Sequence, residues 1–222
     1  MSKHLQRDLE RINRSLMTLF GVVEKMIDDS VSALVGKKVQ LVNTVIESDN
    51  KVNDLEVQVE EECLKILALH QPYAADLRHL TTVLKINANL ERIADLTCNI
   101  AERAECLHNS PFFPLPDELK PMVDRATQMI RMALNSFVNS DSALAKQVIL
   151  FDVAVDEFNL SIINELRGLM KQDSTLIEPA LHCFSASRHI ERIADHAENI
   201  AEDVIYLVDG DIVRHKHGNF IA

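Results

Sequence analysis

The chain has 222 residues, of which 47% are apolar, so it can bury a sizeable core and is not a disordered protein. Five glycines, six prolines, no tryptophan and only 5% aromatic residues argue against turn-rich sandwiches and barrels. The formal net charge of −11 argues against broad electrostatic binding to nucleic acid or to anionic lipid.

Apolar periodicity predicts three long helices in the first half of the chain, at about residues 5–36, 41–71 and 74–108. In the first, seven apolar residues from Leu5 to Met26 follow a strict 4-3-4-3 spacing, which is typical of a helix packed nearly parallel to its neighbours. Gly36 offers a C-terminal stop. The second can begin with a short separate piece at 41–46, and Pro72 disfavours helix in the residue before it.

The next segment holds four of the six prolines within residues 111–121, which we therefore interpret as a linker. Helical periodicity resumes at Met122. Residues 140–142 offer an N-cap for a further helix, and Asp173 offers the N-cap of the last helix, which runs to about Val208. The predicted organisation is a first three-helix unit at 1–110, a proline-rich linker at 111–121, and a second three-helix unit at 122–222.

The two halves align with each other. A shift of 103 residues superimposes the apolar stripes of the second helix of each half, and Asp49 falls on Asp152. A shift of 100 residues superimposes Glu91-Arg-Ile-Ala-Asp95 on Glu191-Arg-Ile-Ala-Asp195, and the Asn-Ile-Ala-Glu segment that follows also matches. A repeat of this length predicts an all-α fold of two tandem three-helix bundles.

Spaced carboxylates on these helices predict two metal sites. The candidate ligands are Asp49, Asn53, Glu91 and Asp95 in the first half, and Asp152, Asp156, Glu191 and Asp195 in the second. Two antiparallel helices that each present an acid-x-x-x-acid pair can place four oxygen ligands around one point. Partly buried carboxylates repel each other unless neutralised, and a divalent ion such as Mg, Mn, Zn or Fe would neutralise them.

Two alternatives to metal stay open at this point. Any solvated helix face can carry an acidic stripe, and Arg92 and Arg192 could neutralise the neighbouring acids without metal. A carboxylate-bridged di-metal enzyme would need two Glu-x-x-His pairs, and the chain has only Glu105-x-x-His108. We also expect three histidines of the last helix near its acidic stripe: His182, His189 and His196.

The repeated ERIAD…NIAE motif resembles the PhoU family. The segment Gln71-Pro-x-Ala-x-Asp-Leu-Arg78 and the ending Val204-Ile-Tyr-Leu-Val208, followed by Val213-Arg-His215, carry the same resemblance over nearly the whole chain. The family pattern usually reads ERIGD, and alanine stands at the glycine position here in both copies. Asn53 stands where the family tends to have Asp, which leaves the first cluster poorer in charge.

The resemblance implies two three-helix bundles in tandem and a negative regulator of phosphate uptake and of the bacterial phosphate-starvation response. It implies an adaptor rather than an enzyme, often a homodimer, between the ATPase subunit of the phosphate ABC transporter and a phosphate-sensing histidine kinase. It also implies metal at the acidic motifs. The polar N-terminal segment and the lack of an apolar run of about 20 residues lead us to expect a cytoplasmic protein that meets the membrane only through protein partners.

Overall fold

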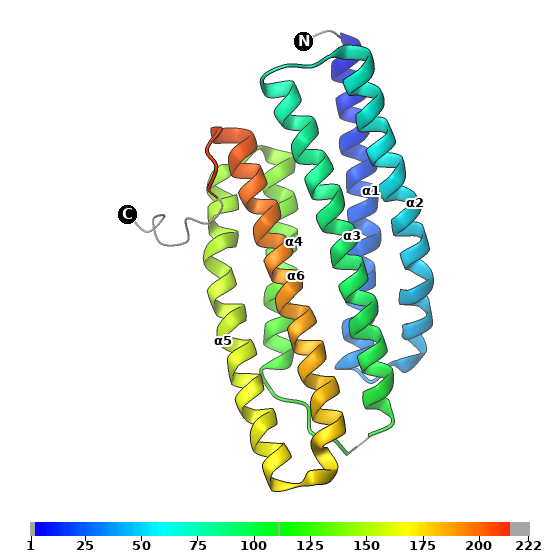
Figure 1. Cartoon of the computed structure of the whole chain (residues 1–222), viewed down its shortest axis with the longest axis vertical. Coiled ribbons are helices and arrows are strands. Elements are labelled where there is room, and N and C mark those ends of the chain that lie inside the picture. The colour runs from blue at the N-terminus through cyan, green and yellow to red at the C-terminus, as the bar shows by residue number, and fades with distance from the viewer. Residues whose placement is uncertain (1–2, 111, 214–222) are drawn as a thin grey trace.

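The computed structural model describes residues 3–110 and 112–213, and in these residues the protein is helical with no strand (Figure 1). The elements are α1 (Lys3–Leu34), η1 (Val39–Leu41), α2 (Val42–His70), α3 (Ala75–His108), α4 (Leu119–Asn139), α5 (Ser142–Gln172), η2 (Ser174–Leu176) and α6 (Ile177–Asp209). The all-α prediction is confirmed. His215 of the terminal motif lies outside the described residues.

The helix boundaries follow from local chemistry. The seven stripe residues of α1 are all buried, as their spacing predicts. The helix ends at Leu34, but the residue with positive φ is Lys37 at 53° and not the predicted stop, Gly36. Gly36 is needed for a different reason, because a Cβ there would lie 2.6 Å from the Ser32 carbonyl oxygen. The short piece expected at 41–46 is instead the start of α2, preceded by the η1 turn.

The proline-rich segment is shorter than predicted, because α4 begins at Leu119 and not at Met122. Pro121 lies in the first turn of α4, where its missing N–H would have had no partner within the helix. Upstream, Phe113 is 5% exposed and lines a small pocket with Leu34 and Leu107, so the connection is anchored to the first bundle. Asp173 caps the η2 turn that precedes α6 and not α6 itself.

The six long helices form two bundles that lie side by side, α1–α3 and α4–α6 (Figure 1). The third helices of the two repeats, α3 and α6, pack against each other along their length, and we call this contact the seam. Across it Lys85 meets Asp203, whereas Arg103, further along α3, meets His182. The two helices therefore run antiparallel, and the repeats are related by an approximate twofold axis through the seam.

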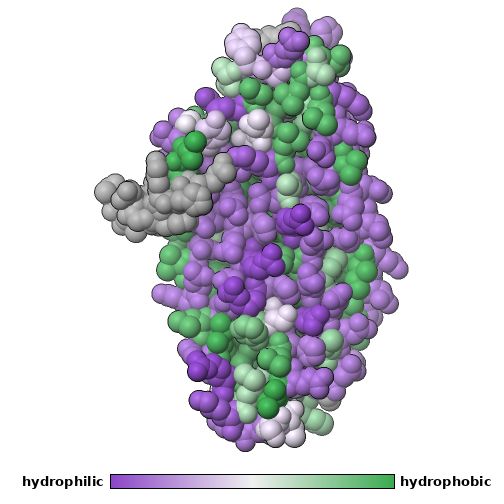
Figure 2. Space-filling model, viewed as in Figure 1, coloured by the Kyte–Doolittle hydropathy of each residue, from purple (hydrophilic) through white to green (hydrophobic). Residues whose placement is uncertain are grey.

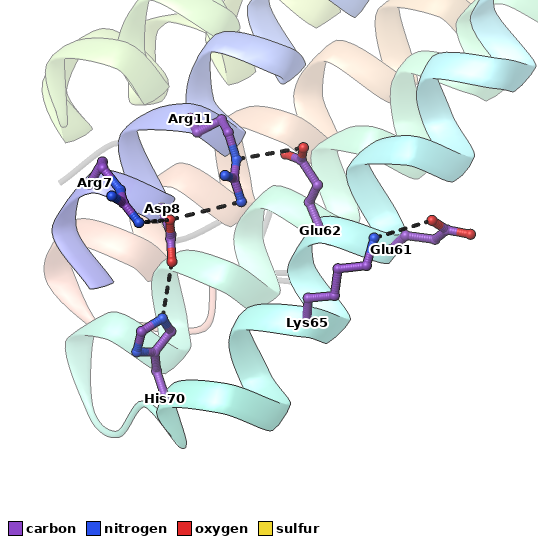
Figure 3. Close-up of polar contacts among 7 residues, drawn as sticks. All are labelled: Arg7, Asp8, Arg11, Glu61, Glu62, Lys65 and His70. Carbon is purple, nitrogen blue, oxygen red and sulfur yellow. Dashed lines mark hydrogen bonds and ion pairs between the residues drawn. The ribbon is translucent and has the colours of Figure 1, made fainter. Parts of the chain in front are cut away.

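Polar contacts fasten the ends of α1 and α2 to each other (Figure 3). His70 Nε2 lies 3.1 Å from Asp8 Oδ2, and Arg11 Nε lies 3.6 Å from Glu62 Oε1. The hydrogen bond to His70 is the main cause that lowers the pKa of Asp8. These contacts link the N-terminal end of α1 to the C-terminal half of α2. Among the described residues, no helix is long and apolar enough to cross a membrane.

Candidate functional site

The first predicted cluster, Asp49, Asn53, Glu91 and Asp95, lies where α2 meets α3. Asn53 Nδ2 donates a hydrogen bond to Asp49 Oδ2 at 3.1 Å, so the amide partly satisfies one carboxylate. Burial raises the pKa of Glu91, and the charges of Asp95 and Asp49 add to the rise. Arg92 opposes it, lying 3.4 Å from both Glu91 Oε2 and Asp95 Oδ2. The structure thus brings these side chains into electrostatic contact across two helices.

The second predicted cluster, Asp152, Asp156, Glu191 and Asp195, lies where α5 meets α6 and carries more uncompensated negative charge. Burial raises the pKa of Asp152 to about 7, and the charges of Glu198 and Asp156 contribute further. Glu198, on the same helix as Glu191, also has a pKa raised to about 7 by burial and by neighbouring carboxylates. The raised pKa values show that burial and mutual repulsion disfavour the charged forms of these two acids.

Three carboxylate oxygens in the clusters are buried and accept no hydrogen bond from the described residues: Asp49 Oδ1, Asp152 Oδ1 and Glu191 Oε2. Burying such an oxygen without a partner is costly, and hard divalent cations prefer such ligands. The chemistry of these donors therefore suits a divalent cation. With the side chains as placed in the described ranges, no group of three or more His, Cys, Asp or Glu could hold one. The metal sites stay a prediction.

Arginines neutralise part of each cluster, as one of the alternatives expected. Arg92 does so in the first half. In the second, Arg188 and Arg192 both oppose the rise in the pKa of Asp195, and Arg188 Nη1 donates to Glu191 Oε1 at 2.6 Å. The sequence carries a signal for this pair, because Arg188 stands three residues before Glu191 on a helix.

Sequence reasoning also missed Cys98 as a neighbour of the first cluster. Burial, with the charges of Asp49 and Asp95, raises the pKa of this thiol to about 12. The 100-residue shift places Cys98 at the position of Glu198, so the repeat alignment already held this information. The two clusters therefore differ at two positions, with Asn53 and Cys98 replacing Asp156 and Glu198.

The histidines of α6 lie at the seam with α3, and not at the acidic stripe where we expected them. His196 Nδ1 donates to Asn89 Oδ1 at 2.8 Å, and His182 Nδ1 lies 3.5 Å from Arg103 Nη1. Burial lowers the pKa of His196, and Arg192 and Arg92 lower it further. A shallow groove on the seam is lined by Lys85, Ala88, Asn89, Arg92, Asn199 and Asp203.

The family model described as the PhoU domain matches the chain twice, at residues 16–104 and 119–204. The chain belongs to the PhoU family. Each match ends on the third helix of its bundle, so the family's repeat coincides with the structural repeat. The ERIAD motifs that carried the resemblance lie inside both matches, on α3 and α6, which confirms the family expected from the sequence.

Named relatives span almost the whole chain. A phosphate-specific transport system accessory protein PhoU homolog of Pseudomonas putida is 38% identical over 216 residues, which cover 97% of this chain and 84% of the relative. The phosphate-specific transport system accessory protein PhoU of Escherichia coli K12 is 33% identical over 223 residues, covering 99% and 92%.

Two solved PhoU structures share the fold. The crystal structure of PhoU from Pseudomonas aeruginosa superimposes with a TM-score of 0.90 at 37% identity, covering 93% of this chain and 99% of that one. The phosphate transport system regulatory protein PhoU from Streptococcus pneumoniae gives 0.88 at 25% identity, covering 94% and 99%. The prediction of two tandem three-helix bundles is thereby confirmed.

Proposed function

We propose that this chain is an accessory protein of phosphate-specific transport that restrains phosphate uptake and the phosphate-starvation response. The observation that carries the proposal is near-full-length identity of 33–38% to PhoU proteins named as accessories of that transport system. The match to the Pseudomonas aeruginosa structure, which covers 93% of this chain and 99% of that one, supports a shared role for the whole molecule.

The regulator acts as an adaptor at the cytoplasmic side of the membrane. Its partners are the ATPase subunit of the phosphate ABC transporter and a phosphate-sensing histidine kinase, and its working form is a homodimer. Long exposed helical faces suit this role, because helices present side chains to partners without building a reaction centre. Figure 2 shows that the middle of one such face is hydrophilic and that hydrophobic residues gather below it, over the part where α5 and α6 join.

Divalent cations occupy the two acidic clusters in this proposal. They would bind the buried oxygens that accept no hydrogen bond from the described residues, chiefly Asp152 Oδ1 and Glu191 Oε2, and would remove the mutual repulsion of the carboxylates. The expected consequence is a more rigid junction of α5 with α6. Elemental analysis of protein purified without chelator tests this part, since metal content should fall in a Glu191→Ala plus Asp195→Ala variant. Sub-stoichiometric metal that the double variant leaves unchanged would refute it.

We prefer a regulatory role over a di-metal enzyme because the Glu-x-x-His pair of the chain, Glu105 and His108, does not lie at either acidic cluster. Glu105 and His108 are both exposed at the end of α3, ten residues or more beyond Asp95. At about 1.5 Å per residue, the distance along the helix is too large for them to share a site with the first cluster.

The decisive experiment is deletion of the gene in its native host. The strain should express alkaline phosphatase constitutively in high phosphate, and the wild-type gene should restore repression. A pull-down from native membranes with the tagged full-length protein should recover the transporter ATPase and the histidine kinase. Normal repression in the deletion strain would overturn the regulatory proposal.

A further inference from the structure

The two ends of the seam are equivalent by the repeat but differ in charge balance. At one end Lys85 Nζ lies 2.8 Å from Asp203 Oδ1, so a cation faces an anion. The 100-residue shift carries Lys85 onto Ser185 and Asp203 onto Arg103. The ion pair of one end is therefore replaced at the other by a hydroxyl and a second cation.

Arg103 has only loose partners for a half-buried guanidinium. Its Nη2 lies 3.4 Å from Glu102 Oε2, and its Nη1 lies 3.5 Å from His182 Nδ1, whereas charge-assisted hydrogen bonds are normally about 2.7–2.9 Å long. Its Nε is buried and makes no hydrogen bond to any described residue. This guanidinium therefore has donors that its neighbours leave unsatisfied or only weakly satisfied, and an anionic ligand could accept from them.

His189 supplies a second available donor on the facing helix. Its Nε2 lies 3.3 Å from Ser185 Oγ, while its Nδ1 is buried and has no hydrogen-bond partner in the described parts of the chain. When the Ser185 hydroxyl donates to Nε2, the ring proton of the neutral imidazole resides on Nδ1. Arg192, Arg103 and Glu102 lie near enough to act on the ring electrostatically, so two cations and one anion surround it.

We propose that Arg103 and His189 form a binding site for a free tetrahedral oxyanion of the phosphate class at this end of the seam. The guanidinium Nε–H and the imidazole Nδ1–H donate to the anion, and Ser185 is a positioning residue that fixes the tautomer of His189. Glu102 lies beside the guanidinium and can accept a hydrogen bond from a protonated phosphate oxygen. Sulfate has the same shape but carries no proton at neutral pH, so Glu102 disfavours sulfate.

This site is separate from the acidic clusters and does not depend on the regulatory role. Phosphate binding is measured on the purified protein, whereas regulation is measured in the cell. A negative result in one experiment therefore does not refute the proposal that the other experiment tests. Because α3 and α6 belong to different bundles, an anion held between them would link the occupancy of the site to the packing of the bundles.

The test is titration of the metal-free full-length protein with inorganic phosphate, followed by calorimetry, with sulfate as the second ligand. We expect one phosphate site, weaker binding of sulfate, and a loss of about tenfold or more in phosphate affinity for Arg103→Gln. Arg14→Gln, which removes the same charge from an exposed position on α1, should leave the affinity unchanged. Thermal melts of both variants establish that they are folded.

Two further measurements sharpen the assignment. Glu102→Gln should narrow the preference for phosphate over sulfate, and NMR of the histidine nitrogens should show the His189 proton on Nδ1 in the wild-type protein. Equal phosphate affinity of the wild type and Arg103→Gln would overturn the site. So would sulfate binding as tight as phosphate binding, or a His189 proton on Nε2.

Discussion

Lys85 Nζ lies 2.8 Å from Asp203 Oδ1 and so joins α3 of the first bundle to α6 of the second. The Asp203 side chain is only 6% exposed, and the Lys85 ammonium also lies 5.8 Å from the centre of the Tyr206 ring. Replacing Lys85 by Met removes a cation from beside a buried carboxylate. We expect the free energy of unfolding to fall by about 1–3 kcal/mol in urea denaturation. Lys51→Met, at an exposed site on α2, is the matched control, and an equal loss in both would contradict the role of the ion pair.

The second cluster predicts that metal-free protein becomes less stable as the pH rises. Asp152 and Glu198 have pKa values of about 7 in the folded state, against ordinary values of 3.8 and 4.5 for Asp and Glu. Between about pH 4.5 and pH 7 the folded state therefore holds protons that the unfolded state releases, so stability is lost as the pH rises through that window. Thermal melts across it should show the loss.

The control for this pH dependence is the double variant Asp152→Asn plus Glu198→Gln. Its Tm should change less with pH in the same window than the Tm of the wild type. Burial lowers the pKa of histidines such as His196, and these groups act in the opposite direction at acid pH. They are present in both proteins, so the difference between the two curves isolates the carboxylates. A difference that does not change with pH would show that the cluster does not retain these protons.

The first cluster should gain cation affinity when its amide is converted to a carboxylate. In Asn53→Asp, the hydrogen bond from Nδ2 to Asp49 is replaced by repulsion between like charges four residues apart, which costs about 0.2–0.5 kcal/mol without metal. Adding manganese should raise Tm more in this variant than in the wild type. Asn164→Asp adds the same charge at an exposed position on α5 and should show no such gain. Equal shifts in both variants would count against cation binding at this cluster.

Two glycines of the first bundle should respond in opposite directions to alanine. Gly21 is exposed in the middle of α1 and a Cβ there meets nothing within 4 Å, so Gly21→Ala should raise the free energy of unfolding by about 0.5–1 kcal/mol. Gly36→Ala should lower it, because the new Cβ would lie 2.6 Å from the Ser32 carbonyl oxygen. Chemical denaturation of both variants checks the prediction, which a stabilising Gly36→Ala would contradict.

The fold was predictable because its helices are long and each buries a periodic stripe. The start of α4 was not predictable from the sequence. A proline is typical of a helix break, but Pro121 lies in the first turn of α4, where proline is tolerated. Three of the four residues in each cluster were also predictable from the repeat, which preserves them, while Asn53 falls on Asp156. Of their neutralising partners, Arg92 was predictable, whereas Arg188 was missed although it stands three residues before Glu191 on α6. Likewise, no periodicity shows that His189 faces α3, since α6 buries side chains toward three helices.

The seam pairs two helices that are copies of one another, and this bears on the history of the chain. A polypeptide holding a single repeat would leave the α3 face that α6 covers open to water, including Lys85 and Asn89, which contact Asp203 and His196 across the seam. Two such polypeptides could cover that face by pairing antiparallel through a twofold axis. On this view duplication of the gene preserved an existing interface and freed its two halves to diverge, so that one end keeps Lys85 opposite Asp203 while the other holds Arg103.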